Sequence, residues 1–573
     1  MCRKADTLMK KVSWLVLSFL IAGCGGIPTS SAIHFGSSRA DEITSQFIRV
    51  IAQPPVDGMT PQTLVQGFLD ACGDSSNDYQ VAREYMTGAM ASKWNPNSGA
   101  QVYVGSTLAL TETNDEVSLT AQLDSTISPL GHLSVAANAL NVSASFKLNQ
   151  NEFGQWRISA APDGLLLSRS DVDRGYRPLP VFFSDPTGSQ LVADTIVVPL
   201  SSAGAATSVV RSLLSGPSPE LAGAVRNNFP TGTRLTFGSV PVNVGIADVD
   251  LTQDVLAADA TMRKALVAQL VWTLVQLPNV TAVRVLVSGQ ALDVPGAVNP
   301  HTLKEWKAFA PAGISPDASL HVLVGGSIRS ASKAQEVSAT LVPSLTSTLL
   351  SASQDSLSPH FAAVITGGQT LVADFAELGV LNEVFKGESL TRPTWDRVGN
   401  IYVADYGTGV SQISPLGEIL AVPIDVTING SGNQVRRIAI APDGVRVALV
   451  FTDGVQDTLA VAALVQENGS ARITGVHRIE GQITSVTDLA WSSQIKIQAL
   501  GSDGTGGQKL FDVGLADGRV TANAVPLGAS SIAIDPQGVT YLGVTAATSS
   551  NVVKPAFGQW SNVVDGAGPL FAQ

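Results

Sequence analysis

Cysteine is scarce in this sequence: its 573 residues include only Cys2, Cys24 and Cys72. Three widely separated cysteines support neither a disulfide framework nor the paired spacing of a zinc site. Charged residues make up 14% of the chain and hydrophobic residues 45%, which excludes an intrinsically disordered protein. Basic residues number 35 against 47 acidic ones, so the surface repels phosphate backbones and nucleic acid is excluded as a partner. A chain of this length is expected to form several domains.

Motifs of catalysis are missing as well. None of the six histidines belongs to a His-Glu-x-x-His zinc helix; they are His34, His132, His301, His321, His360 and His477. The sequence has no Gly-x-Ser-x-Gly nucleophile elbow and no lysine-containing phosphate loop. Asp248 and Asp250 would share one strand face. Two carboxylates placed in this way can bind a cation or transfer protons; the alternative is that they lie at a strand end and cap a turn. We predict no catalytic residue, no cofactor site, no metal site and no enzyme activity.

The N-terminus has the pattern of a secretion signal. Lys10 and Lys11 precede a mostly apolar run, residues 12–22, which is too short to cross a bilayer. The run ends in Leu20-Ile21-Ala22-Gly23-Cys24, which resembles the bacterial lipobox. This resemblance implies a signal peptide over 1–23 and lipidation of Cys24, whereas the alternative is a plain signal peptide with an incidental cysteine. Small and polar residues over 24–45 then predict a flexible tether.

Residues 46–170 are predicted to form an α+β domain. Thr60 and Pro61 mark a helix start, and Leu64, Val65, Phe68 and Leu69 would lie on one buried face. A second helix is expected from Asp78, and strands are expected over 101–111, 116–123, 140–148 and 155–159. Two helices followed by a meandering sheet resemble the NTF2-like fold, which hosts both enzymes and binding modules.

Residues 175–295 are predicted to form an α/β domain. A strand over 190–200 and a helix ending at Leu214 precede strands over 234–237 and 244–251. Met262, Leu266, Leu270 and Leu274 recur every four residues, with Val267 and Val271 widening the apolar stripe of a long helix. A strand follows over 283–287. The stretches 213–218, 247–252 and 269–274 are similar to the signature of the GerMN domain, which implies an extracytoplasmic binding module without catalytic residues.

Residues 315–573 contain internal repeats. Trp395, Ile440, Trp491 and Ile534 lie in similar segments about 45 residues apart, each usually followed by a turn rich in Asp, Pro and Gly. This period predicts a β-propeller of five or six blades, with a pair of β-sandwiches as the alternative. Leu357-Ser358-Pro359 is expected to open a further blade and residues 321–325 to supply a closing strand. Because Asp396, Asp443 and Asp535 occupy equivalent positions, they are expected to shape turns.

The domain order resembles one family, the LpqB lipoproteins of actinobacteria. The lipobox, the opening 57–61 (Asp-Gly-Met-Thr-Pro), and the stretches 68–71 and 82–85 carry the match, together with the GerMN-like region and the propeller. The resemblance implies a protein held by Cys24 on the extracytoplasmic face of the cell membrane. It further implies contact with the extracellular sensor domain of an MtrB-like histidine kinase that governs cell-wall homeostasis and division.

Two other functions stay open at this point. A lipoprotein that binds cell-wall glycan or muropeptide would need exposed aromatic residues gathered on one propeller face. Buried packing is nevertheless expected for Trp94, Trp156, Trp272, Trp306, Trp395, Trp491 and Trp560, with Trp306 and Trp560 the least constrained. A hydrolase would need histidines or carboxylates that converge in the propeller channel.

Overall fold

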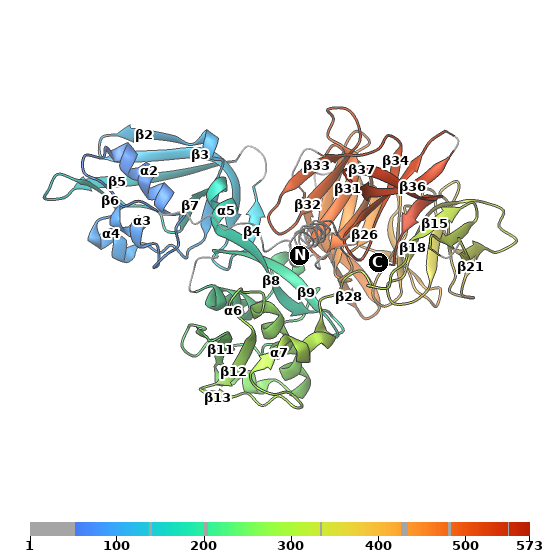
Figure 1. Cartoon of the computed structure of the whole chain (residues 1–573), viewed down its shortest axis with the longest axis horizontal. Helices are drawn as coiled ribbons and strands as arrows, with labels where there is room; N and C mark the ends of the chain where they lie inside the picture. The colour runs from blue at the N-terminus through green and yellow to red at the C-terminus, as the bar shows by residue number, and fades with distance from the viewer. Residues whose placement is uncertain are drawn as a thin grey trace, which may run out of the picture. The chain divides into compact units, whose positions relative to one another are not determined.

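The computed structural model describes residues 52–136, 140–199, 204–332, 335–425, 434–479, 483–547 and 549–572. The predicted signal peptide, the predicted lipidation site Cys24 and the predicted tether lie outside these residues. By its internal contacts the chain divides into a unit of residues 1–46 and a compact unit of residues 47–573. The architecture is multidomain, with an N-terminal α/β region, a GerMN-like middle domain and an all-β C-terminal region (Figure 1). The predicted domain boundaries remain predictions.

The N-terminal region packs short helices against a sheet with the strand order β6-β5-β3-β1-β7, and β2 and β4 also pair with β3. Its elements are α2 Pro61–Ala71, α3 Gln80–Glu84, α4 Gly88–Lys93, β1 Ala100–Tyr103, β2 Ala109–Thr113, β3 Glu116–Ile127, β4 Leu133–Val135, β5 Asn141–Gln150, β6 Trp156–Ala160, β7 Leu165–Ser168 and α5 Arg169–Gly175. The side chain of Thr60 caps α2 by accepting from Thr63 N, and the predicted apolar face of α2 is buried. Phe68 packs edge-on against Trp94 and Phe146, so aromatic rings fill this core.

Two predicted elements of this region differ in the structure. The strand expected over 101–111 is divided into β1 and β2 by a 3₁₀ turn, Gly105–Thr107, in which the Thr107 hydroxyl donates to Val104 O. The hydroxyl therefore bends the chain away from the sheet ladder. The second helix begins at Gln80, because Asn77, Asp78 and Tyr79 have left-handed backbone angles that no helix accommodates.

The middle domain places two helices beside a small mixed sheet. Its elements are β8 Tyr176–Ser184, β9 Leu191–Pro199, α6 Ala205–Ser215, the 3₁₀ turn Pro219–Leu221, β10 Val242–Asn243, β11 Ile246–Leu251, the 3₁₀ turn Gln253–Ala257, α7 Ala260–Leu274, β12 Ala282–Val287, β13 Gln290–Ala291, β14 His301–Thr302 and the 3₁₀ segment Leu303–Phe309. Strands β11 and β12 are parallel and are joined by α7. The strand expected over 234–237 is reduced to a single bridge between Leu235 and Leu251.

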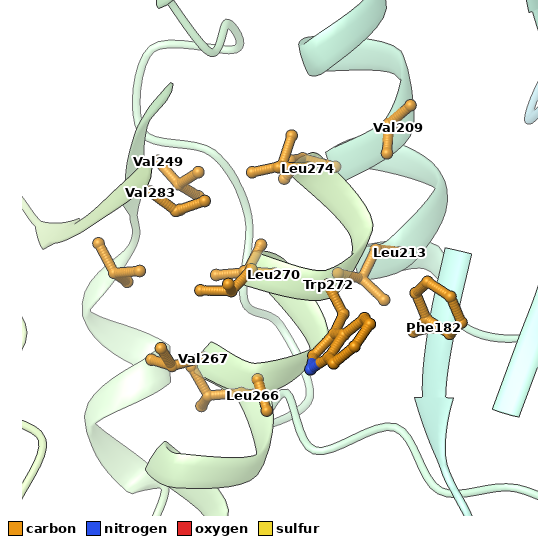
Figure 2. Packing of buried hydrophobic residues seen from close by; sticks show 14 of the residues in the cluster. Phe182, Val209, Leu213, Val249, Leu266, Val267, Leu270, Trp272, Leu274 and Val283 are labelled. Atoms are coloured by element: carbon orange, nitrogen blue, oxygen red, sulfur yellow. The ribbon is translucent and has the colours of Figure 1, made fainter. Parts of the chain in front are cut away.

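Helix α7 lies at the centre of the middle-domain core. Figure 2 shows its Leu266, Leu270 and Leu274 among side chains from α6, β8, β11 and β12. The predicted stripe is buried except for Met262, which is partly buried, and burial extends to every residue from Ala265 to Leu274. A helix that is enclosed on all sides buries its polar residues too, and here Gln269 and Thr273 bond to β8: Gln269 Nε2 donates to Phe182 O, and Thr273 Oγ1 accepts from Phe182 N.

The C-terminal region is a six-bladed β-propeller within the described residues. Blade one comprises β18 Leu349–Gln354, β19 Phe361–Ile365, β20 Thr370–Ala373 and β21 Val380–Lys386, and blade two comprises β22 Thr394–Trp395, β23 Ile401–Asp405, β24 Gly409–Ile413 and β25 Ile419–Val422. Blade three comprises β26 Gln434–Ile440, β27 Arg446–Thr452, β28 Asp457–Glu467 and β29 Ser470–Arg478. Blade four comprises β30 Ser485–Ser493, β31 Lys496–Ser502, β32 Lys509–Gly514 and β33 Val520–Ala524, and blade five comprises β34 Ala529–Ile534, β35 Thr540–Thr545, β36 Ser550–Ala556 and β37 Gln559–Asp565. The first strands of successive blades contact one another around the ring.

The sixth blade closes the ring with strands from both ends of the domain. Its first strand is β38 Ala567–Leu570, and its other strands are β15 His321–Val324, β16 Ser327–Ser330 and β17 Val337–Leu341. Strand β15 confirms the predicted closing strand at residues 321–325, whereas Leu357–Pro359 lies in the first turn of blade one rather than in its first strand. All four repeat residues, Trp395, Ile440, Trp491 and Ile534, fall in the first strands of their blades, so the repeat period was interpreted correctly.

Candidate functional site at the propeller channel and the domain junction

Charged side chains from three blades meet at the propeller axis. Asp488 in β30 accepts from Arg437 Nε of β26 at 2.8 Å and from Arg392 Nη1, just before β22, at 3.2 Å. Its carboxylate also accepts from Ile532 N of β34 at 3.0 Å. All three charged side chains are at least 85% buried. They form a network that joins the first strands of several blades.

The arginines of this network also donate to backbone carbonyl groups of several blades. Arg392 donates from Nε to Ala352 O at 2.8 Å and from Nη1 to Ile532 O at 3.0 Å. Arg437 donates from Nη1 to Ile438 O at 2.7 Å and to Arg392 O at 3.1 Å. Guanidinium groups that are fixed in this way act as cross-braces between blades.

Electrostatics holds Asp488 in its charged form. Burial raises the pKa of the Asp488 carboxyl, but the charges of Arg437 and Arg392 outweigh burial and leave this pKa below its usual value. A carboxylate that stays ionised and is fully hydrogen-bonded is a poor proton carrier. A hydrolase would need an acid or base in the channel that can exchange protons. Asp488 instead belongs to a structural ion network.

The aspartates that the repeat places at equivalent positions shape turns. In Asp396, Asp443 and Asp535 the Oδ1 atom accepts two backbone N–H groups of the following turn, at 2.8–3.0 Å. The predicted turn role is confirmed. In blade four Ser493 stands in for the aspartate, because Ser493 Oγ accepts from Ile495 N.

The blade that departs from the repeat contacts the middle domain. Gln494, in the β30–β31 turn, accepts from Ala193 N of β9 through Oε1 at 2.7 Å. Its Nε2 donates to Leu191 O at 3.2 Å and to Ala312 O at 2.8 Å. Gln494 is buried, so these bonds are shielded from water. Sequence reasoning missed this contact, although the absent Asp-Gly turn in blade four was its signal.

A second propeller residue holds the same backbone position of β9. Arg446 of β27 donates to the carbonyl oxygen of Ala193 and, at 2.7 Å, to Asp443 Oδ2. Both polar backbone groups of Ala193 are therefore bound by the propeller, one by Gln494 and the other by Arg446. The side chain of Val192 packs with Leu221 and Val445 in a small shared cluster. The middle domain and the propeller are consequently joined through a buried interface.

The paired strands β8 and β9 contribute to three hydrophobic cores. Tyr176 and Val197 belong to the N-terminal core, where the Tyr176 hydroxyl lies 3.4 Å from that of Tyr79. Phe182 belongs to the middle-domain core, and Val192 belongs to the cluster shared with the propeller. This two-stranded ribbon (Figure 1) therefore contributes buried side chains to the cores of all three regions.

A cavity of about 150 Å³ lies where the three regions meet. His132 and Val135 line it from the N-terminal region, Thr195 from β9, and His477 and Leu515 from the propeller. The hydroxyl oxygen of Thr195 is buried without a hydrogen-bond partner. Two histidines that are far apart in the sequence thus share one mixed polar and apolar cavity.

The carboxylate pair of β11 has structural partners. Asp248 forms a 3.0 Å ion pair with Arg284 of β12, and Asp250 Oδ1 accepts from the Thr236 hydroxyl at 3.3 Å. Over the described ranges, no group of three or more His, Cys, Asp or Glu side chains is placed to hold a metal ion. Neither aspartate caps a turn: both lie within β11, Asp248 pairs with the neighbouring strand, and Asp250 contacts Thr236.

The remaining histidines are dispersed. His301 is 1% exposed and its ring nitrogens form no hydrogen bond, although Nδ1 lies 3.9 Å from a carboxylate oxygen of Glu305; His360 Nδ1 lies 3.2 Å from the buried carboxylate of Asp374. His321 is buried in β15. His34 lies outside the described residues. Burial lowers the pKa of His301, and the charge of Glu305 only partly opposes this effect.

The predicted burial of the tryptophans holds with small differences, and Cys72 is buried as well. Buried tryptophans are Trp94, Trp272, Trp306, Trp395 and Trp491, whereas Trp156 and Trp560 are half-buried. Trp306 is thus part of the middle-domain core. Burial raises the pKa of the Cys72 thiol far above its usual value, so this cysteine is an unreactive core residue. Among the described helices none is both long and apolar enough to cross a bilayer.

Three family models match successive parts of the chain. They are the Lipoprotein LpqB N-terminal domain over residues 54–173, the sporulation and spore germination domain over 180–293, and the Lipoprotein LpqB beta-propeller domain over 326–572. The chain belongs to the LpqB family of lipoproteins. The LpqB of Thermobifida fusca is 27% identical over all of both chains. The LpqB of Cutibacterium acnes is 25% identical over 93% of this chain and 90% of its own.

One solved structure with GerMN domains aligns with part of this LpqB-family chain. The tandem GerMN domains of the sporulation protein GerM from Bacillus subtilis align with 16% identity and a TM-score of 0.20. The alignment covers 27% of this chain and 58% of that one.

Proposed function

We propose that this LpqB-family lipoprotein is anchored through Cys24 on the extracytoplasmic face of the membrane, where it binds and modulates the sensor domain of an MtrB-like histidine kinase. The main support is the family match, which spans the N-terminal, GerMN-like and propeller regions together. A binding role is consistent with the ion network of the propeller channel, in which Arg392 and Arg437 hold Asp488 in a structural contact.

The junction between the regions suits a protein that presents several surfaces at once. Gln494 and Arg446 fix β9 against the propeller, and the β8–β9 ribbon extends into the N-terminal core. A partner that contacts two of these regions would meet them in a fixed relative arrangement, which lowers the entropy lost on binding.

A binding assay with purified partners tests the proposal. Residues 47–573 form a compact unit and can be titrated with the extracellular sensor domain of an MtrB-like kinase in calorimetry or a pull-down. We expect saturable binding and a changed autophosphorylation rate of the full-length kinase in vesicles. Absence of binding with both proteins folded would contradict the proposal.

The anchor has its own test. The full-length chain is expected to incorporate radiolabelled palmitate and to fractionate with membranes, whereas the Cys24→Ser chain should lose the label. Label retained in Cys24→Ser would show that the acyl chains are attached elsewhere, and Cys72→Ser serves as the matched control because Cys72 is buried.

The glycan-binding alternative receives less support from the propeller surface. Among the described propeller residues, the exposed aromatic side chains are Tyr406 and Phe557. Tyr406 lies in a turn between the second and third strands of blade two, and Phe557 between the third and fourth strands of blade five. In antiparallel blades these turns are at opposite faces, so the two rings do not form one stacking platform.

A further inference from the structure

The hairpin between β36 and β37 has an unusual turn. Ala556 pairs with Gln559, so Phe557 and Gly558 form a two-residue loop. Both residues have positive φ, 51° for Phe557 and 77° for Gly558. Hairpin turns with two positive φ angles favour Asn-Gly, because asparagine tolerates the left-handed region and a bulky side chain does not.

No contact within the described residues compensates for this strain. Phe557 is fully exposed, at 107% of its reference area, so its ring packs against nothing in the folded chain. Blade three provides an internal comparison, because its β28–β29 turn has the same two-residue geometry and contains Asn468-Gly469, with φ of 53° and 82°. The aromatic residue in blade five is therefore unfavourable for the fold by itself.

The neighbouring residues give the hairpin tip an amphipathic character. Pro555 pairs with the half-buried Trp560 across the hairpin, and the ammonium of Lys554 lies 5.6 Å from the Tyr541 ring. Residues 551–564 contain one lysine and no acidic residue, although acidic residues outnumber basic ones in the whole chain. We call residues Pro555–Trp560 the aromatic tip.

We infer that the aromatic tip is a membrane-contact loop, in which Phe557 inserts into the headgroup region of the lipid bilayer and Trp560, which packs in part against the core of blades four and five, lies at the edge of the contact. Phenylalanine and tryptophan favour this region, because their rings enter the acyl boundary while the indole N–H stays hydrated. The absence of acidic side chains removes repulsion from anionic headgroups, and Lys554 adds attraction. A lipoprotein is already held near a bilayer, so even a weak second contact would orient the propeller on it.

Vesicle binding of the compact unit tests this contact without the lipid anchor. Residues 47–573 are mixed with vesicles of phosphatidylethanolamine and phosphatidylglycerol, and the bound fraction is measured by co-sedimentation. We expect Phe557→Asn to weaken partitioning about tenfold, equivalent to about 1.4 kcal/mol, because one inserted ring is lost. Brominated lipids should quench tryptophan emission in the parent chain, and Trp560→Phe should remove that quenching.

The same substitution separates binding from folding. Phe557→Asn creates the preferred Asn-Gly turn, so the thermal midpoint is expected to stay equal or rise while vesicle binding falls. Val455→Asn is the matched control, because Val455 is an exposed turn residue of blade three and should leave vesicle binding unchanged. Equal vesicle binding by Phe557→Asn and the parent chain would overturn the inference. Loss of kinase-sensor binding in this variant, with no vesicle binding by the parent chain, would instead assign the tip to a protein partner.

Discussion

At the scale of single residues, the buried charges of the propeller axis are the most consequential side chains. Asp488 is shared by Arg392 and Arg437, which come from two other blades. Removing one member of such a network leaves the others charged in an apolar environment. The resulting loss in the free energy of unfolding exceeds the net stabilisation that the intact ion pair provides.

We predict that Asp488→Asn lowers the free energy of unfolding of the propeller by about 3–5 kcal/mol, because two buried guanidinium groups lose their counter-charge. Denaturant unfolding followed by tryptophan fluorescence measures the change. Glu467→Gln is the control, since its pair with Arg472 is exposed and should contribute less than about 1 kcal/mol. The pKa of Asp488 is lowered in the folded chain, so its stabilising contribution exists above about pH 4 and is lost as the pH falls.

His301 predicts a second pH dependence, at higher pH. Burial lowers its pKa, so the folded chain favours the neutral ring, and stability should fall as the pH drops below about 6.5, where the unfolded chain takes up the proton. Arg284, on the adjacent strand β12, is paired with Asp248, the buried side chains of α7 are uncharged, and Glu305 is the charged group near the ring.

We expect His301→Gln to reduce the pH dependence of middle-domain stability between about pH 7 and pH 5. Thermal unfolding at several pH values measures this, with the exposed His477→Gln as the control. An unchanged pH slope in His301→Gln would assign the acid sensitivity to another group.

At the scale of elements, α7 shows what an apolar periodicity in the sequence can predict and what it cannot. The four-residue recurrence correctly predicted a helix that buries Leu266, Leu270 and Leu274. It did not predict burial of the other faces, because these contact α6, β8 and the segment around Trp306, which are distant in the sequence.

We predict that Leu270→Ala destabilises the middle domain by about 2–5 kcal/mol, because it opens a cavity in a core without solvent access (Figure 2). Met262→Ala, two turns earlier on the same helix and only partly buried, should cost clearly less. Urea unfolding of both variants measures the difference in the free energy of unfolding. Equal losses would mean that neighbouring side chains fill the cavity left by Leu270→Ala.

At the scale of the whole molecule, the ribbon of β8 and β9 and the buried Gln494 determine how the regions are connected. Contacts between the N-terminal region and the propeller are more exposed: Arg519 pairs with Asp173, and Arg169 donates to Asp517 O at 3.4 Å. The middle domain and the propeller should therefore separate less readily than the N-terminal region and the propeller.

We expect Gln494→Ala to loosen the junction, because it leaves Ala193 N, Leu191 O and Ala312 O without side-chain partners in a buried interface. Hydrogen exchange at Ala193 and proteolysis in residues 310–320 should both accelerate. Gln508→Ala, on an exposed loop of the same blade, should change neither measurement. Unaltered exchange at Ala193 in Gln494→Ala would show that Arg446 and Val192 suffice to hold β9.

Sequence reasoning covered the elements more fully than the site. Periodicity identified α2, α7 and the first strands of four blades, because these signals depend on residues near one another in the chain. It left the blade count at five or six, since the sixth blade combines β15–β17 with β38 across the whole domain. The ion network was not predicted, because Arg392, Arg437 and Asp488 have no common motif and meet only when the ring closes.

By itself the sequence determined the domain types, the family and the turn role of the repeated aspartates, since composition, periodicity and motifs are local properties. Tertiary structure alone decided which charges fill the propeller axis, which propeller residues bind β9 and which aromatic side chains are left exposed. The physical reason is that burial and pairing depend on closure of the ring and on docking of domains, which bring together residues separated by up to several hundred positions.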